Sequence, residues 1–392
     1  MTERAEVGGY HSVVDFNVHG LIGVRLINAS ADDVAAVTRQ IGALQAPLLD
    51  EPDVTLRFVR YYPAAHLCYL GRWKQGFTDD AFFVFEEGLN GAKVRIPFDK
   101  LGGPCEIVCE SGLQSVPLLL PILGLTALAK GYVAVHASAL VHNGVGILMP
   151  GWAHSGKTTA LLGFATLAAE FVGEEWVLLS GDGQKMYGLP TEIAISSAHL
   201  ETLPGIRHAI EPSRLWQCEG LSMVSRMLRA VLGKRLAHTL VGKGVHKVIT
   251  ELQGRTTPKI APPAIFINRV AKMAAKPDKL FLLVNHDDPC IQVEPTPPSK
   301  MASRIAPLVH HEQMKFMEHY LAFTFAFPRA RNPFIECAPQ LQLTILLCAL
   351  AGMNSYTIRH PYPLVFSDFY EKVASFCDAP EMTRTEPVCA LR

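Results

Sequence analysis

The chain has 392 residues and a mass of 42.9 kDa, which at roughly 150 residues per domain predicts two or three domains. Hydrophobic residues make up 49% of the sequence and charged residues 18%, so the chain can bury a large core and global disorder is excluded. Thirty-six basic residues balance thirty-six acidic ones, which argues against a protein held to nucleic acid or anionic lipid by its overall charge.

Cysteine usage and the chain start point to a reducing compartment. The nine cysteines include no CxxC pair, and the closest two, Cys105 and Cys109, lack the second pair that a zinc site needs. The polar start, MTERAEVGGYHS, has no apolar core of a secretory signal, and the apolar stretch from Val116 to Ala129 is too short to span a bilayer. We therefore expect a cytoplasmic protein with reduced thiols, which needs neither a membrane nor nucleic acid as a partner.

Residues 1–112 are predicted to form a small N-terminal α/β domain with no residues at catalytic spacing. Ser30 is a candidate N-cap for a helix over Ala31 to Leu44. The expected strands are rich in Val, Ile, Leu and Phe and cover Val13 to Ile27 (as one or two strands), Val54 to Tyr62, Ala81 to Phe85 and Lys93 to Ile96.

Residues 113–300 show the strand–loop–helix–strand order that is typical of an α/β nucleotide-binding core. A helix over Pro117 to Ala129 comes first, and Asn143-Gly144 is a strong two-residue hairpin signal. The other expected elements are strands at Tyr132 to Val141 and Val145 to Met149, a loop over Pro150 to Gly156, a helix from Lys157 to about Ala168, a strand at Phe171-Val172 and a hairpin over Trp176 to Tyr187.

Residues 214–259 carry nine basic residues against two acidic ones. Apolar residues recur there at helical spacing, so we expect an amphipathic helix whose basic face is either simply solvated or a docking surface for acidic peptides or phosphates. After a linker at Pro258 to Pro263, strands are expected at Ala264 to Ile267 and Leu280 to Val284. A helical C-terminal extension at 301–380 and a tail at 381–392 complete the chain, with helices at Lys300 to Tyr320, Cys337 to Met353 and Phe366 to Phe376.

One motif carries a clear chemical signal. Residues 151–158, GWAHSGKT, fit G-x-x-x-x-G-K-[ST], the phosphate-binding P-loop, and they fall between a predicted strand and a predicted helix. Gly151 and Gly156 let the backbone curl so that its N–H groups face phosphate oxygens, and the helix start adds its positive dipole end. Lys157 is expected to bridge the β- and γ-phosphates and Thr158 to ligate Mg²⁺, which predicts ATP and Mg²⁺ as cofactors.

Two adjacent carboxylates, Glu174 and Glu175, follow the strand that comes after the P-loop helix. A carboxylate at this point belongs beside the metal and the γ-phosphate. We expect Glu174 to hold Mg²⁺ together with Thr158, and the second carboxylate to take the proton from an attacking hydroxyl.

These features together resemble a known family. The run His136-Ala137-Ser138-Ala139, the hairpin, the P-loop, the acidic pair and Gly188-Leu189-Pro190 are similar to the HPr kinase/phosphorylase-like group, which is related to ATP-dependent phosphoenolpyruvate carboxykinase. The group includes bacterial serine kinases that act on the carrier protein HPr, and members of peptide biosynthesis clusters that phosphorylate a ribosomally made precursor. The resemblance is specific over about residues 115–195 and weaker over Leu280 to Pro363.

The resemblance implies a P-loop core of the HPr kinase/phosphoenolpyruvate carboxykinase type and assigns roles to single residues. His136 matches a histidine near the transferred phosphate, and Glu174 and Glu175 stand where the family has two aspartates. Glutamate carboxylates reach about 1.5 Å further, so the chain is either an active kinase with an adjusted site or a nucleotide binder that has lost transfer. The implied nucleotide-binding residues are Gly151, Ser155, Gly156, Lys157, Thr158 and Thr159.

The leading prediction is an ATP- and Mg²⁺-dependent kinase that phosphorylates a hydroxyl, expected to be serine, of a peptide or protein such as a ribosomally made precursor. Its expected catalytic residues are His136, Lys157, Glu174 and Glu175. Two alternatives stay open: a small-molecule hydroxyl kinase on the same scaffold, and a non-catalytic nucleotide-binding or peptide-delivery module, which the glutamate pair motivates. The sequence does not decide the acceptor or the role of the N-terminal domain. It also leaves the oligomeric state open, and a homo-oligomer is one option.

Several other polar residues give weaker signals. Arg255 loosely matches an arginine that the family has near a Gly-rich turn, and Arg329, Arg331 and Arg359 are candidate contacts for a phosphate or an acidic substrate. His310, His311 and Glu312 lie in a helical pattern, where adjacent histidines point to different faces, and this argues against a metal site.

Overall fold

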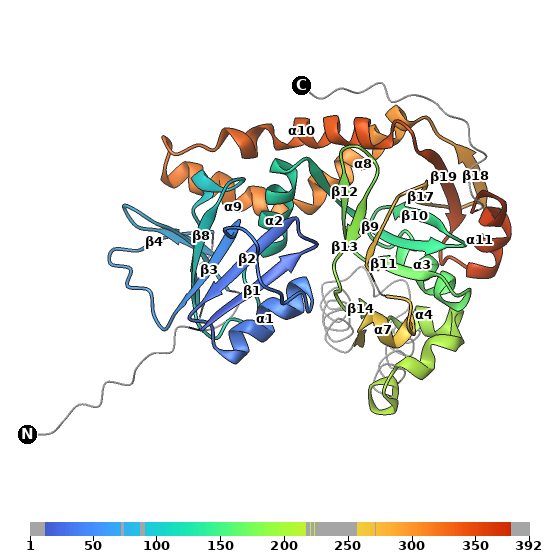
Figure 1. Ribbon diagram of the computed structural model, residues 1–392, viewed down its shortest axis with the longest axis horizontal. Helices are drawn as coiled ribbons and strands as arrows, with labels where there is room; N and C mark the ends of the chain where they lie inside the picture. Colours follow the sequence, from blue (N-terminus) through green and yellow to red (C-terminus); the bar gives the residue numbers. More distant parts are fainter. Residues whose placement is uncertain are drawn as a thin grey trace, which may run out of the picture.

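The computed structural model describes residues 12–71, 74–86, 91–216, 220, 223, 257–270 and 272–377. Two β-sheets lie side by side, and a layer of helices runs across both of them (Figure 1). The helices are α1 Ala31–Ile41, α2 Leu119–Ala129, α3 Lys157–Thr166, α4 Ser197–Thr202, α7 Pro262–Ile265, α8 Pro298–Glu312, α9 Met314–Ala326, α10 Pro333–Leu350 and α11 Phe366–Val373.

The first sheet has eight strands in the order β1-β2-β3-β8-β7-β6-β5-β4. β3 lies parallel to β2 and β8, and the other neighbours are antiparallel. The strands are β1 Val13–Val18, β2 Ile22–Ile27, β3 Val54–Val59, β4 Cys68–Leu70, β5 Gln75–Phe77, β6 Phe82–Phe85, β7 Lys93–Arg95 and β8 Cys105–Glu110. α1 begins at the predicted cap, because Ser30 accepts from the N–H of Asp33 and the Asp33 carboxylate accepts from the N–H of Ser30.

The second sheet has nine strands in the order β16-β13-β12-β9-β10-β17-β19-β18, and β11 also pairs with β9. The central strand β10 is antiparallel to β9 and parallel to β17, which in turn is parallel to β19. The strands are β9 Tyr132–His142, β10 Val145–Pro150, β11 Glu170–Gly173, β12 Trp176–Ser180, β13 Met186–Gly188, β16 Ala274–Ala275, β17 Lys279–His286, β18 Gln292–Pro295 and β19 Asn354–Pro361, with β14 Ile193–Ala194 and β15 Lys259–Ile260 in a separate pair.

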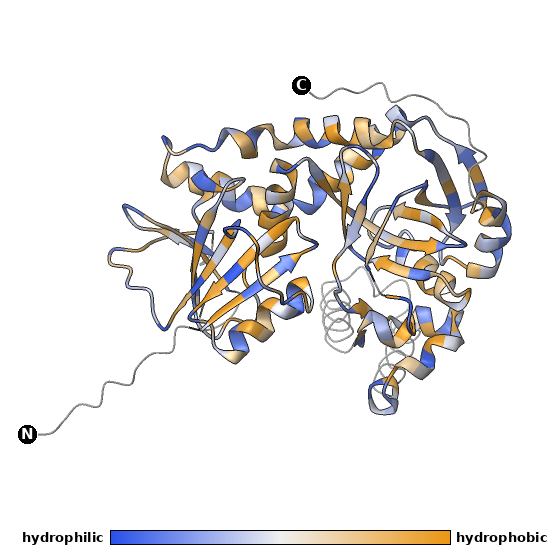
Figure 2. Cartoon of the chain, viewed as in Figure 1, coloured by the Kyte–Doolittle hydropathy of each residue, from blue (hydrophilic) through white to orange (hydrophobic). Residues whose placement is uncertain are grey.

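Apolar residues concentrate on the strands of both sheets and on the helices that cover them (Figure 2). One continuous core joins the first sheet to the second through α2, α8, α9 and α10. A second core lies between the second sheet and the pair α3 and α11, where Phe164 contacts Phe366 edge-on at a ring distance of 5.4 Å. The β10–α3 connection is thereby held between two packed layers.

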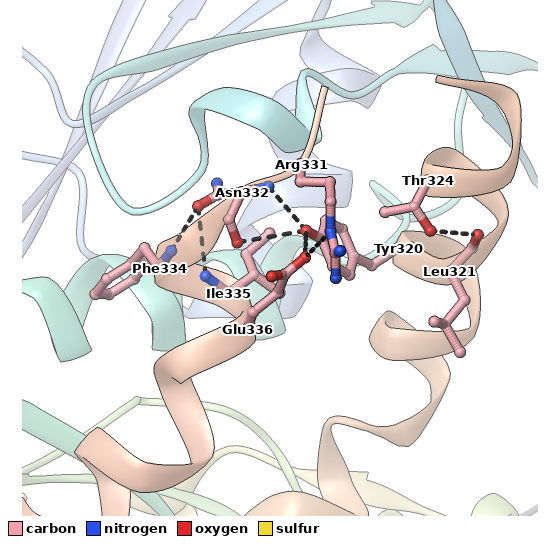
Figure 3. Close-up of polar contacts among 8 residues, drawn as sticks. All are labelled: Tyr320, Leu321, Thr324, Arg331, Asn332, Phe334, Ile335 and Glu336. Carbon is pink, nitrogen blue, oxygen red and sulfur yellow. Dashed lines mark hydrogen bonds and ion pairs between the residues drawn. The ribbon is translucent and has the colours of Figure 1, made fainter. Parts of the chain in front are cut away.

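A corner between α9 and α10 fixes the helical layer to the first sheet (Figure 3). Asn332 caps α10 by accepting from the N–H of Phe334 at 3.0 Å, and its amide donates to the carbonyls of Phe98 and Leu101 at 2.8 Å each. The Tyr320 hydroxyl accepts from the N–H of Asn332 at 2.8 Å. These bonds set where α9 lies over the strands.

The predicted α/β class is confirmed: the structure mixes helices with two mixed sheets. The expected strand at Ala264 to Ile267 is wrong, because Pro262 and Pro263 start the short helix α7, and proline is preorganised for the first helical turn. The extension predicted as helical for 301–380 contains a strand, β19, whose Ile358 is fully buried where β19 pairs with β17. Three further strands were not predicted from the sequence: the short strands β4 and β5, and β8 between Cys105 and Glu110.

Most of the basic segment at 214–259, including Arg255, lies outside the described residues. α10 has the length and apolar composition of a helix that could cross a membrane, and here it packs on α8 and α2 as part of the core. None of the seven cysteines in the described part forms a disulfide, and burial raises the pKa of Cys105 to about 12.

Candidate functional site

The P-loop leaves the central strand β10 at Pro150 and enters α3 at Lys157. Neighbouring strands hold it from the side. Gly151 bridges to Leu283 of β17, Asn285 donates to the carbonyl of His154 at 3.0 Å, and a ring nitrogen of His360 on β19 bonds to the carbonyl of Ser155 at 2.9 Å. The loop thus sits at the carboxyl ends of parallel strands, where open α/β sheets bind ligands.

Both motif glycines are required by the geometry of the loop. Gly156 has φ +85°, a conformation that side chains disfavour, and it is the N-cap of α3. A Cβ on Gly151 would lie 2.3 Å from Ser155 Oγ and 2.9 Å from the carbonyl oxygen of Leu283. Ser155 Oγ itself is buried without a hydrogen-bond partner in the described part of the chain, so the loop holds a polar group suited to a phosphate oxygen.

Lys157 lies buried within the loop that precedes it. Its Nζ donates to the carbonyls of Gly151 and Trp152, each at 2.9 Å, and the residue is only 6% exposed. Burial lowers the pKa of Lys157, and the neighbouring carboxylates, Glu174 foremost, oppose that shift. A buried lysine in the first turn of a helix is suited to a polyanion, because the helix start adds its own unpaired N–H groups.

Glu174 lies beside the first turn of α3. Thr158 Oγ1 donates to Glu174 Oε1 at 2.5 Å, and the hydroxyl of Ser138 on β9 donates to Oε2. Burial raises the pKa of Glu174, while the two hydroxyl bonds work against the rise. The hydroxyl and the carboxylate expected to share Mg²⁺ are therefore in contact.

Glu175 has a different environment from its neighbour. Its side chain is exposed and its backbone adopts φ +64°, a left-handed conformation that costs about 1–3 kcal/mol in a non-glycine residue. The tight turn is closed by the N–H of Trp176, which donates to the carbonyl of Glu174 at 2.8 Å. The turn thus sends Glu174 inward and leaves Glu175 outward, so the two carboxylates are not equivalent.

His136 has a partner that the sequence analysis did not assign. Its Nδ1 lies 2.5 Å from Oε1 of Glu312, the last residue of α8. The bond to His136 is the main cause that lowers the pKa of Glu312. A carboxylate on Nδ1 fixes the orientation of an imidazole and leaves Nε2 for proton transfer.

The last turn of α8 also contacts the P-loop directly. The ring of Trp152 stacks on His311 with centroids 4.5 Å apart and planes 29° apart. Adjacent residues of this turn therefore contact two different parts of the site: His311 stacks on Trp152 of the loop, and Glu312 bonds to His136. The described residues contain no group of three or more His, Cys, Asp or Glu suited to a metal.

A Mg²⁺ site does not require such a group of three or more side chains. Proteins hold this ion through one or two carboxylates, with nucleotide phosphates and water completing the shell. Thr158 and Glu174, which are in contact, could supply that partial set.

Two cavities adjoin the site. The smaller, about 250 Å³, is lined by P-loop residues 154–159, by α4 and by Tyr362 to Leu364. His199 of α4 faces it, and burial lowers the pKa of this histidine to about 4, so the ring is neutral at pH 7. The larger, about 1120 Å³, lies between the first sheet, α2 and α9 and reaches Glu312 and Trp176.

The candidate arginines lie elsewhere. Arg331 pairs with Glu336 at 2.7 Å in the α9–α10 corner, Arg359 pairs with Glu294 at 2.7 Å between β19 and β18, and Arg329 is exposed. Neither Arg331 nor Arg359 contacts the P-loop in these pairs.

The sequence was also compared with known proteins. No family model matches the chain, and no curated protein is significantly similar to it.

Proposed function

We propose that the protein is an ATP- and Mg²⁺-dependent kinase that transfers the γ-phosphate to a hydroxyl, expected to be serine, of a peptide or protein. The observation that carries the proposal is the contact of Thr158 with Glu174 at the end of a P-loop. P-loop enzymes use this pairing of a loop hydroxyl with a strand-end carboxylate to hold the metal. The unpartnered Ser155 hydroxyl and the buried Lys157 add to the support for a phosphate-binding loop.

The site residues divide into two groups in this proposal. Lys157 and the loop N–H groups bind the triphosphate and stabilise the charge that spreads over the transferring phosphoryl group. Thr158 and Glu174 hold Mg²⁺, which when bound neutralises charge on the β- and γ-phosphates. Glu175 lies close enough to interact with the charge of Lys157.

In the transfer step the acceptor oxygen forms a bond to the γ-phosphorus while the bond from that phosphorus to the β,γ-bridging oxygen breaks. ADP leaves, and the hydroxyl proton passes to Nε2 of His136. The sequence indicated Glu175 as the proton acceptor, and we assign the step to His136 instead because a carboxylate fixes its ring, whereas the Glu175 side chain is exposed. Glu312 orients the ring and balances the charge that forms on it. Glu312 is thus a positioning residue, while His136 acts on the acceptor.

The proposal is tested by incubating the full chain with MgATP labelled on the γ-phosphate and a pool of random-sequence peptides with one central serine. Labelled peptide is expected from the wild type and not from Lys157→Ala. The matched control is Lys185→Ala, because Lys185 is an exposed lysine at the β12–β13 turn. Equal labelling by wild type and Lys157→Ala would contradict the proposal.

A further inference from the structure

We infer that the 1120 Å³ cavity between the first sheet and helices α2 and α9 binds the acceptor, and that the acceptor is a segment of a polypeptide rather than a small molecule. This inference rests on the proposed kinase function. It gives the N-terminal sheet, which carries no catalytic residue, a role in holding the substrate (Figure 1).

The cavity reaches Glu312, the partner of the histidine proposed to receive the proton. Glu312 both lines the cavity and bonds to Nδ1 of His136. Trp176 also lines it, directly follows Glu175 and lies opposite His136 in the β9–β12 register. A hydroxyl at this end of the cavity would therefore lie beside two residues, Glu312 and Trp176, that both adjoin the histidine.

The nucleotide would use a different set of residues. The smaller cavity is formed by the P-loop, α4 and the loop after β19, and it shares no lining residue with the larger one. One cavity is lined by Lys157 and Thr158 and the other by Glu312. Two separate cavities of this kind fit a reaction with two substrates, in which the smaller serves ATP and the larger the acceptor.

The size and chemistry of the larger cavity favour a peptide. Its volume of about 1120 Å³ exceeds the range of roughly 300–1,000 Å³ that is usual for small-molecule sites. Apolar side chains such as Phe85 and Leu118 line it together with three lysines and three glutamates, so no single charge dominates. Mixed apolar and oppositely charged walls suit a peptide with several kinds of side chain, whereas a sugar or a phosphorylated metabolite would call for a smaller polar or basic site.

The walls are held in place before any substrate binds. His319 of α9, a lining residue, bonds to the buried side chain of Gln75 on β5. At the corner between α9 and α10, the Asn332 amide donates to the carbonyls of Phe98 and Leu101. When the side chains of a cavity are already ordered, substrate binding loses less conformational entropy, and the affinity is higher.

The test fills the cavity without touching the catalytic residues. Leu120→Trp adds a large ring at a half-buried lining position of α2. The matched control is Leu321→Trp, on an α9 residue that is 64% exposed and does not line the cavity. Each variant is assayed as full chain for phosphorylation of the random peptide pool, for MgATP binding by calorimetry, and for folding by thermal unfolding.

We expect Leu120→Trp to lose peptide phosphorylation by on the order of tenfold or more while it keeps MgATP affinity, and Leu321→Trp to behave as wild type. Tyr69→Ala, at a lining residue that is 51% exposed, should raise KM for peptides several-fold with little change in kcat. Undiminished peptide phosphorylation by Leu120→Trp would overturn the inference. So would a wild-type protein that binds MgATP and labels free serine or sugars but no peptide, whereas absence of MgATP binding would instead defeat the underlying kinase proposal.

Discussion

The carboxylate of Glu312 lies 2.5 Å from Nδ1 of His136, although 176 residues separate the two along the chain. The contact joins the end of α8 to the central part of β9, next to the strand that carries the P-loop. It links the helical layer, the second sheet and the larger cavity at one point. Its chemical consequence is an imidazole with a fixed orientation.

Glu312→Gln is therefore expected to slow phosphoryl transfer by about 10- to 100-fold, since the neutral amide orients the ring poorly and balances no charge. Because Glu312 makes no proposed contact with ATP, the Kd for MgATP should stay at the wild-type value. His136→Gln should likewise slow phosphoryl transfer and leave the Kd for MgATP unchanged. The double variant should be no slower than the slower single variant. Additive losses in the double variant would show that the two residues act independently.

The magnesium dependence of ATP binding should change with pH through Glu174. Only the ionised carboxylate binds Mg²⁺, and burial raises the pKa of this group above that of an ordinary glutamate. As the pH falls, Mg²⁺-dependent binding should therefore weaken at a higher pH than an exposed glutamate would cause. Calorimetric titrations of ATP with and without Mg²⁺ across a pH series measure this effect.

In that series Glu174→Gln should bind ATP with little help from Mg²⁺ at any pH, and Glu174→Asp should retain a pH-dependent response. Glu192→Gln, at an exposed position outside the site, is the control and should follow the wild type. A wild-type Mg²⁺ effect that persists in Glu174→Gln would remove Glu174 from the metal site.

Gly151→Ala should weaken MgATP binding by about 10- to 100-fold, because a methyl group there meets Ser155 Oγ at 2.3 Å and the loop must shift to admit it. Gly205→Ala is the matched control, since a Cβ at Gly205 meets nothing within 4 Å. Both variants should remain folded by circular dichroism. Wild-type affinity in Gly151→Ala would mean that the observed loop conformation is not the one that binds phosphate.

The hydrogen bonds of Asn332 at the α9–α10 corner are expected to contribute to the free energy of unfolding. Asn332→Ala removes a helix cap and leaves two buried carbonyls, those of Phe98 and Leu101, without their donor, for an expected loss of about 2–4 kcal/mol in the free energy of unfolding. Asn332→Asp keeps the cap acceptor but turns a buried carboxylate oxygen toward the same two carbonyls, so its loss should be at least as large as that of Asn332→Ala. Urea unfolding measures both.

The control for this corner is Thr324→Ala, because the Thr324 hydroxyl bonds only to the nearby carbonyl of Leu321 on an exposed helix face (Figure 3). Its effect should stay within about 0.5 kcal/mol. Equal effects of Thr324→Ala and Asn332→Ala would show that the Asn332 amide contributes little to holding α9 on the sheet.

The sequence predicted the parts of the site whose residues are close along the chain. The β9–β10 hairpin, the P-loop and α3 follow from local signals, namely Asn143-Gly144, the two motif glycines and the alternation of apolar residues. Glu174 follows from its distance to Lys157 along the chain. Each of these signals spans fewer than about forty residues, which is the range of one strand–helix–strand unit.

The rest depended on tertiary structure. In the sequence, His311 and Glu312 have the pattern of ordinary polar residues on an amphipathic helix. No local pattern indicates that His311 contacts Trp152 or that Glu312 bonds to His136. β19 was missed because it lies between helices in sequence, and its burial comes from pairing with β17 and β18. The larger cavity could not be predicted, since its walls come from the first sheet, α2, β12 and the end of the helical layer.

The most direct test of the central claim is a calorimetric titration of the full chain with ATP, with and without Mg²⁺, beside Lys157→Ala and the control Lys185→Ala. The account predicts binding that Mg²⁺ strengthens, that Lys157→Ala abolishes and that Lys185→Ala leaves unchanged. Absence of ATP binding by the wild type, or equal binding by Lys157→Ala, would contradict it.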